Sequence, residues 1–219
     1  MATLTVYPAT GGSDPVNGLV ERSSVNEAWS TIRAGAGVYA GIDPTPSSFC
    51  YVTATTTTDQ YSRIRRGVFG FATGALGAGA TISSAVLSLY GTTKVVDLGD
   101  TAIDIVGLTL TGNDNIVTGD YGGFDTTVLG TMDTSAFDGA NGWNDFTLNA
   151  AGLAYISKTG TTMFGVRLGW DTTGTGPTWS SAAETYIQCQ FAQSANKPKL
   201  VVTYTPAPLV GGAGFFALL

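Results

Sequence analysis

The sequence contains no histidine, and its 219 residues include only two cysteines. Without histidine, neither Ser-His-Asp nor Cys-His catalysis is available, and histidine-ligated zinc sites are excluded. Cys50 and Cys189 have no CxxC spacing, which excludes thiolate-bound zinc and iron–sulfur clusters. We therefore predict no catalytic residues, no metal and no organic cofactor. Each cysteine lies in a strand-like run, which favours two free buried thiols; a disulfide is the alternative.

Charged residues are also scarce, at 12 % of the chain, and ten basic residues face sixteen acidic ones. The net charge of −6 would repel a phosphate backbone, so we expect no nucleic-acid partner. The basic residues form one small cluster, Arg63, Arg65 and Arg66. Because Arg63 and Arg65 share one strand face, we expect them to pair with aspartate on a neighbouring strand.

No hydrophobic run approaches the length of a transmembrane helix, so we predict no membrane insertion. Residues 1–10 (MATLTVYPAT) lack the basic and apolar regions of a signal peptide. Two interpretations remain open. Met1 is the start of a protein released by lysis, as virion proteins are, or a leader has been removed. Both place the protein outside the cell or on a virion surface.

Threonine and glycine are abundant, with 33 and 30 residues, whereas glutamate is limited to three. Threonine favours strands and glycine favours turns, so the composition predicts a β-rich protein. Strand-like runs separated by turn residues then predict an all-β protein of about nine strands with one short helix. The expected architecture is an antiparallel β-sandwich that forms one domain over residues 1–205. We expect Asn149 to cap the helix and residues 111–142 to form a long loop.

Apolar residues alternate along several of the predicted strands, as expected where one strand face is buried. This pattern predicts a core that contains Ala85, Leu87, Leu89, Ile103, Ile105, Val166, Leu168, Leu200 and Val202.

Four segments carry a resemblance to a known family. They are SRIRRGVFGFATGALGAGATISSAVLSLYGTT (62–93), GWNDFTLNAAGLAYI (142–156), FGVRLGW (164–170) and ANKPKLVVTYT (195–205). Together they resemble the DNRLRE domain family over about residues 1–205. The resemblance implies a jelly-roll-like β-sandwich of extracellular or phage-associated proteins, some of which are regarded as carbohydrate-binding modules. Residues 190–192 (Gln-Phe-Ala) replace an acidic residue of the family.

Three aromatic residues are candidate glycan contacts. Trp170 and Trp179 flank the polar segment DTTGTGPT, and Tyr186 lies on the next predicted strand. Such rings can stack on sugars, although packing at the open end of the sandwich is the competing interpretation. The carboxylates show no pair that stands out for acid–base catalysis, so an enzyme that acts on polysaccharides is a further alternative.

The C-terminal segment, residues 206–219, is apolar, rich in glycine and free of charge. A monomer has no reason to expose such a segment, so we expect it to contact another subunit, with docking on its own sandwich as the rival. The residues expected to make this contact are Leu209, Val210, Phe215, Phe216, Leu218 and Leu219. These features favour a non-catalytic structural subunit of an extracellular filament or virion, whose partners are copies of itself. A carbohydrate-binding module is the alternative.

Overall fold

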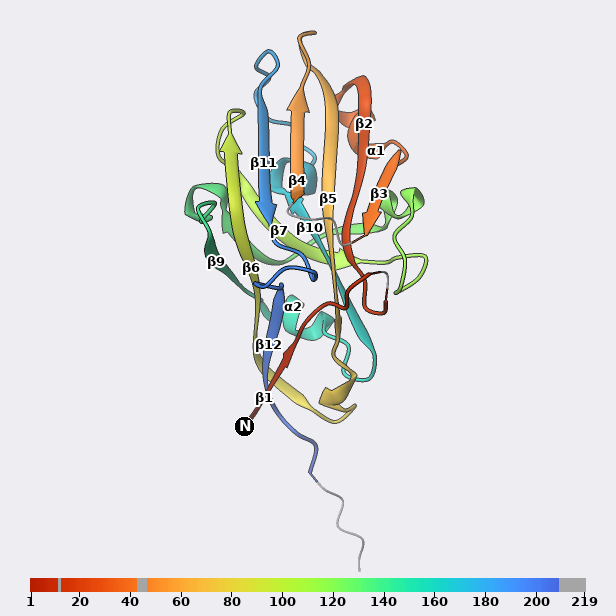
Figure 1. The fold of residues 1–219 in the computed structure, drawn as a ribbon, viewed down its shortest axis with the longest axis vertical. Helices are drawn as coiled ribbons and strands as arrows, with labels where there is room; N and C mark the ends of the chain where they lie inside the picture. Colours follow the sequence, from red (N-terminus) through yellow and green to blue (C-terminus); the bar gives the residue numbers. More distant parts are fainter. Residues whose placement is uncertain (12, 43–46, 209–219) are drawn as a thin grey trace, which may run out of the picture.

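The computed structural model describes residues 1–11, 13–42 and 47–208, which form an antiparallel sheet that curls on itself (Figure 1). The predicted all-β, sandwich-like fold is confirmed. Within the described residues the sheet has twelve strands. These are β1 (Ala2–Val6), β2 (Asn17–Ala28), β3 (Tyr39–Ile42), β4 (Ser47–Ala54), β5 (Gln60–Ala72), β6 (Thr81–Val96), β7 (Ala102–Leu108), β8 (Phe124–Asp133), β9 (Gly142–Thr147), β10 (Thr161–Leu168), β11 (Glu184–Cys189) and β12 (Lys199–Thr205).

Two long strands allow the sheet to curl. β6 pairs with β12 near its start and with β11 near its end, while β9 pairs with its middle. In the same way, β5 pairs with β4 along its first half and with β10 along its second half. The path across the sheet is β1-β12-β6-β11-β4-β5-β10-β7-β8, with β2 alongside β5 and β3 alongside β2. β5 and β6 thus each pair with different strands along their two halves. The sheet curls, and its concave face encloses a single hydrophobic core.

The predicted core is confirmed, since all nine residues that the alternating pattern identified are buried. Aromatic side chains fill much of the space between them. The rings of Phe69 on β5 and Phe191 after β11 are stacked, with centroids 5.5 Å apart, and Phe49 packs edge-on against Phe69. Cys50 and Cys189 are buried, free thiols, as the strand-like runs around them favoured.

Three strands were missed by the sequence analysis. β8 lies within residues 111–142, which were expected to be a loop. The strand was not recognised because most of its solvent-exposed residues are threonine or aspartate. β2 was missed because Glu21 and Arg22 interrupt its apolar run and a bulge follows at Ser23. β3 is only four residues long.

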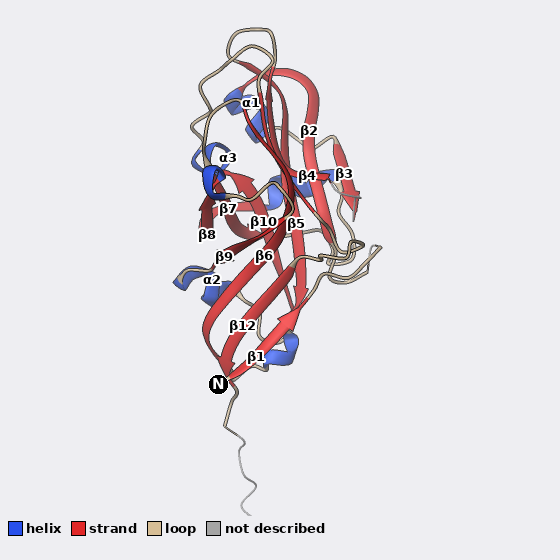
Figure 2. Ribbon diagram, turned by 60° about the vertical axis from the view of Figure 1, so that its left-hand side comes forward, coloured by secondary structure: helices blue, strands red, loops and turns tan. Residues whose placement is uncertain are grey.

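The structure has three short α-helices in its described part, where the sequence analysis expected one. α1 spans Trp29–Ala34, α2 spans Ala150–Tyr155 and α3 spans Gly169–Thr173. The predicted helix is α2, and the Asn149 side chain caps it by accepting a hydrogen bond from the Gly152 N–H at 3.0 Å. α1 and α3 continue directly from β2 and β10, and their N-cap residues, Ala28 and Leu168, have no side chain that caps the helix. Figure 2 shows α1, α2 and α3 on one side of the molecule.

The edge of the sheet carries β1, which pairs with β12 alone among the described strands. β12 ends at Thr205, and residues 206–208 are exposed. The predicted subunit-contact residues Leu209, Val210, Phe215, Phe216, Leu218 and Leu219 lie outside the described residues. No helix in the described part of the chain has the length and apolarity to cross a membrane.

Candidate functional site

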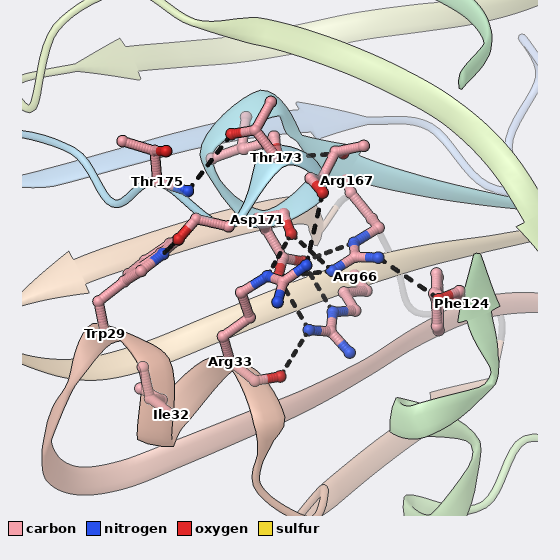
Figure 3. Close-up of polar contacts among 12 residues, drawn as sticks. Trp29, Ile32, Arg33, Arg66, Phe124, Arg167, Asp171, Thr173 and Thr175 are labelled. Atoms are coloured by element: carbon pink, nitrogen blue, oxygen red, sulfur yellow. Dashed lines mark hydrogen bonds and ion pairs between the residues drawn. The ribbon is translucent and has the colours of Figure 1, made fainter. Parts of the chain in front are cut away.

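A buried carboxylate anchors α3 to the sheet. Asp171 on α3 receives two hydrogen bonds from Arg66 on β5, at 2.7 and 2.8 Å, and two from Arg167 on β10, at 2.9 and 2.8 Å (Figure 3). Arg33 on α1 donates to the Asp171 backbone carbonyl at 2.6 Å. Burial alone would raise the pKa of the Asp171 carboxyl, but the charge of Arg66 and the hydrogen bonds from Arg167 and Arg66 lower it to about 2. The carboxylate is therefore charged at neutral pH.

Three guanidinium groups face this single carboxylate, and each also donates hydrogen bonds to backbone carbonyls. Arg66 donates to the carbonyls of Tyr121 and Arg33, and its guanidinium lies 3.8 Å from the centroid of the Tyr121 ring. Arg167 donates to the carbonyls of Asp125 and Asp171 at 2.9 and 2.7 Å. A buried charge needs this degree of hydrogen bonding to be tolerated. The cluster of Arg33, Arg66, Arg167 and Asp171 therefore fixes α3 by bonds to three separate elements.

The loop after α3 is held equally firmly. Gly174, which follows the last residue of α3, has a left-handed φ of 87°, and its carbonyl accepts a hydrogen bond from the Trp29 indole at 3.0 Å. The Tyr61 hydroxyl donates to the Pro177 carbonyl at 2.9 Å, and the Trp29 and Tyr61 rings meet edge to face. Gly176 lies directly against the Trp29 ring. The side chains of Trp29 and Tyr61 therefore hold the loop by hydrogen bonds to its backbone and by packing.

Beside α3 and this loop the surface forms a hollow of about 560 Å³, which we call the α3 hollow. Its wall combines one tryptophan, one carboxylate and several threonines. The lining residues are Thr101, Ala102, Asp104, Val128, Thr131, Gly169, Trp170, Thr173, Thr175, Gly176 and Thr178. The hollow is therefore lined by an aromatic residue, several hydroxyl-bearing residues and one acidic residue.

The structure separates the three aromatic residues that were predicted as glycan contacts. Trp170 lines the α3 hollow and packs in part against the core. Trp179 is also partly buried against the core, and its indole N–H has no hydrogen-bond acceptor among the described residues. Tyr186 on β11 packs against Tyr51, with ring centroids 4.9 Å apart. Trp179 and Tyr186 do not line the hollow.

The residue type predicted to pair with the basic cluster was wrong. Arg65 bonds to Glu21 on β2 at 2.7 Å, and Arg63 lies 3.7 Å from the same carboxylate, so the acidic partner on the neighbouring strand is a glutamate. Arg66 points to the opposite face of β5, where it meets Asp171. The sequence analysis missed Asp171, because an aspartate at the start of a polar, glycine-rich segment is typical of a turn.

A second hollow, of about 430 Å³, lies near the start of β12. It is lined by Tyr7, Trp143, Ala195, Asn196, Lys197 and Lys199. Trp143 and Tyr7 are the exposed aromatics of this surface, and the Lys199 ammonium lies 4.4 Å from the centroid of the Trp143 ring. This surface is basic, whereas no cationic side chain lines the α3 hollow.

No family model and no curated protein matches the sequence. The resemblance to the DNRLRE family therefore stays a prediction. Within residues 1–11, 13–42 and 47–208, no group of three or more His, Cys, Asp or Glu side chains could hold a metal ion. The absence of metals and cofactors from the functional protein likewise stays a prediction.

Proposed function

We propose that the chain is a non-catalytic structural subunit that associates with copies of itself, through its terminal segments, into an extracellular filament or virion assembly. One observation supports this function above the others. The N-terminal strand β1 has a partner on one side only among the described strands, and that partner, β12, is the strand from which the C-terminal segment departs. β1 and the end of β12 therefore lie beside each other at one edge of the sheet (Figure 1).

The unpaired side of β1 suits the addition of a strand. An edge strand presents free N–H and C=O groups, which readily pair with an extended segment of another chain. Thr3 and Thr5 are exposed, whereas Leu4 and Val6 are half-buried and pack against the core. β1 is thus ordered by its own sandwich and still has backbone groups available to a neighbour.

The composition of the C-terminal segment supplies the other half of the contact. Residues 209–219 contain no charged side chain and include Phe215, Phe216, Leu218 and Leu219. Burial of four such side chains contributes about 6–10 kcal/mol before ordering costs are subtracted. A contact between the terminal segment of one copy and a different surface of the next is head-to-tail, so it repeats into a filament or an array.

The test is the assembly state of the full chain and of a chain lacking residues 209–219, measured by sedimentation velocity and negative-stain electron microscopy at matched concentrations. We expect the full chain to form particles or filaments and the truncated chain to remain monomeric. Tyr39→Ser serves as the control, because Tyr39 is an exposed aromatic on β3, away from β1. This variant is expected to assemble normally. Unchanged assembly of the truncated chain would overturn the proposal.

A further inference from the structure

The sequence contains two Asn-Gly pairs, Asn17-Gly18 and Asn141-Gly142. In such a pair the backbone nitrogen of the glycine can attack the side-chain amide of the asparagine, because glycine has no Cβ to obstruct the approach. The amide is then lost as ammonia. Both pairs have the same chemistry in an unfolded chain, so any difference between them in the folded protein comes from the structure.

The structure encloses Asn17 and holds both polar ends of its side chain. Asn17 is 0 % exposed and begins β2. Its Nδ2 atom donates to the Ala9 carbonyl at 3.2 Å, and its Oδ1 atom accepts from the Ala192 N–H at 3.1 Å. The backbone of Gly18 lies between two strands, since it pairs with β3 on one side and with β5 on the other. Reaction at Asn17 therefore requires the sheet to open.

Asn141 has the opposite surroundings. It is exposed, lies in the turn before β9 and has a left-handed φ of 68°, which asparagine tolerates better than most residues do. No hydrogen bond joins its side chain to any residue in the described part of the chain. Gly142 is the first residue of β9 and pairs on one side only, with Gly91 on β6. The amide is thus free to rotate, and the attacking nitrogen lies at the end of a ladder, where opening costs least.

Other side chains hold the rest of this turn. Asn144 is 3 % exposed, accepts a hydrogen bond from the Asp138 N–H at 2.6 Å and donates to the Asp138 and Gly142 carbonyls at 3.0 and 3.2 Å. The Asp138 carboxylate accepts from the Ala140 N–H at 2.7 Å. The turn is therefore ordered on both sides of Asn141 without any contribution from the Asn141 amide.

From this contrast we infer that Asn141 is a site of spontaneous deamidation in the folded protein and that Asn17 is protected. The Gly142 nitrogen forms a bond to Cγ of Asn141, the bond between Cγ and Nδ2 breaks, and Nδ2 leaves as ammonia with the proton from the Gly142 nitrogen. Water then opens the succinimide at either of its two carbonyl carbons, which gives aspartate or isoaspartate. The inference does not depend on self-association of the chain.

The two products differ in their effect on β9. Each adds one negative charge to a chain whose net charge is already −6. Aspartate tolerates the left-handed φ and preserves the turn. Isoaspartate lengthens the main chain by one carbon directly before β9, where space is tight, because a Cβ added at Gly142 or Gly91 would overlap Asp138. We therefore expect isoaspartate, and not aspartate, to weaken the pairing of β9 with β6.

The experiment incubates the full chain at neutral pH, folded in one sample and unfolded by guanidinium chloride in another. Digestion and electron-transfer fragmentation in a mass spectrometer then follow the amide-to-acid mass change at each asparagine. In the folded chain we expect modification at Asn141 to be at least about ten-fold faster than at Asn17, which reacts only through opening of the sheet. In the unfolded chain we expect the two rates to be similar.

Two variants at the same position separate the amide from the turn. Asn141→Gly keeps the left-handed φ and has no amide, so its incubation is expected to give no acidic species on isoelectric focusing. Asn141→Asp carries the charge alone, and we expect it to melt at a higher temperature than the incubated natural chain, which also contains isoaspartate.

The inference is overturned if Asn141 and Asn17 react equally fast in the folded chain, if their rates differ as much in the unfolded chain, or if Asn141→Gly still becomes acidic. An equal Tm of Asn141→Asp and the incubated chain would contradict the expected effect of isoaspartate on β9. Assembly is not measured in this experiment, so its failure leaves the proposed function standing.

Discussion

Arg66 and Asp171 are 105 residues apart in the sequence, yet they form a bidentate ion pair beneath the surface of the sheet. Their side chains are 4 % and 1 % exposed. The pair joins β5 to α3, and α3 in turn supplies Trp170 to the α3 hollow. A buried ion pair is weak support for stability in itself, but it makes removal of either partner costly. The ion pair therefore links the stability of the fold to the position of α3, which supplies residues that line the α3 hollow.

Removal of the carboxylate is the first test of this coupling. Asp171→Ala leaves Arg66 and Arg167 buried without a counter-charge. We expect the free energy of unfolding to fall by about 3–5 kcal/mol. Urea denaturation followed by tryptophan fluorescence measures the loss. The matched control is Glu27→Ala, which removes the half-buried partner of Arg22 and is expected to cost about 1 kcal/mol or less. Equal losses in the two variants would contradict this account.

The same carboxylate predicts how stability depends on pH. The pKa of Asp171 is about 2 in the folded protein, below the value of about 3.9 in an unfolded chain. The stabilisation is therefore complete above about pH 4 and is lost as the pH falls toward 2, by an amount on the order of 2–3 kcal/mol. We expect the stability difference between the natural chain and Asp171→Asn to narrow over this range. Urea denaturation of both proteins from neutral to acid pH measures it, and a difference that stays constant or widens would be inconsistent with the assigned ion pair.

Gly176 tests whether the loop after α3 depends on close packing against Trp29. An added Cβ at Gly176 would lie 2.8 Å from Cγ of the Trp29 ring, so one of them must move. We expect Gly176→Ala to lower the free energy of unfolding by about 1–3 kcal/mol. In Gly122→Ala, the control, the Cβ meets no atom within 4 Å, and the change is expected to stay within about 0.5 kcal/mol. Thermal unfolding of both variants decides the point.

The thiols give a prediction that requires no mutation. Burial raises the pKa of both Cys50 and Cys189, so each is a protonated, enclosed thiol at neutral pH. We expect neither to react with a thiol reagent such as DTNB in the native protein and both to react after denaturation without reductant. Rapid labelling of the native protein, or fewer than two thiols after denaturation, would show that the assignment of two buried free cysteines is wrong.

Alternation of apolar residues explains why the sequence predicted the core and many of the strands. Leu87 and Leu89 on β6, like Ile103 and Ile105 on β7, are separated by one residue and lie on the same buried face. β8 could not be found in this way. Only part of one face of β8 is buried, and Gly130 interrupts its apolar run.

The candidate site was only partly predictable, because its key contacts join distant elements. Trp170 was named from the sequence as a candidate glycan contact, since a tryptophan beside a polar loop is visible there; it lines the α3 hollow, and the glycan contact stays a prediction. The place of Asp104 in the same wall was not predictable, because it depends on β8 as a neighbour and that strand was missed. The alternation of Ile64, Arg66 and Val68 along β5 could have indicated that Arg66 faces inward, but nothing local identified Asp171 as its partner.

Cryo-electron microscopy of the assembled full chain tests the central claim most directly, by showing what lies along the free side of β1. The account predicts an extended segment of a neighbouring copy that is hydrogen bonded to the unpaired backbone groups of Ala2–Val6. A particle in which this side of β1 faces solvent, with the copies joined through another surface, would contradict it.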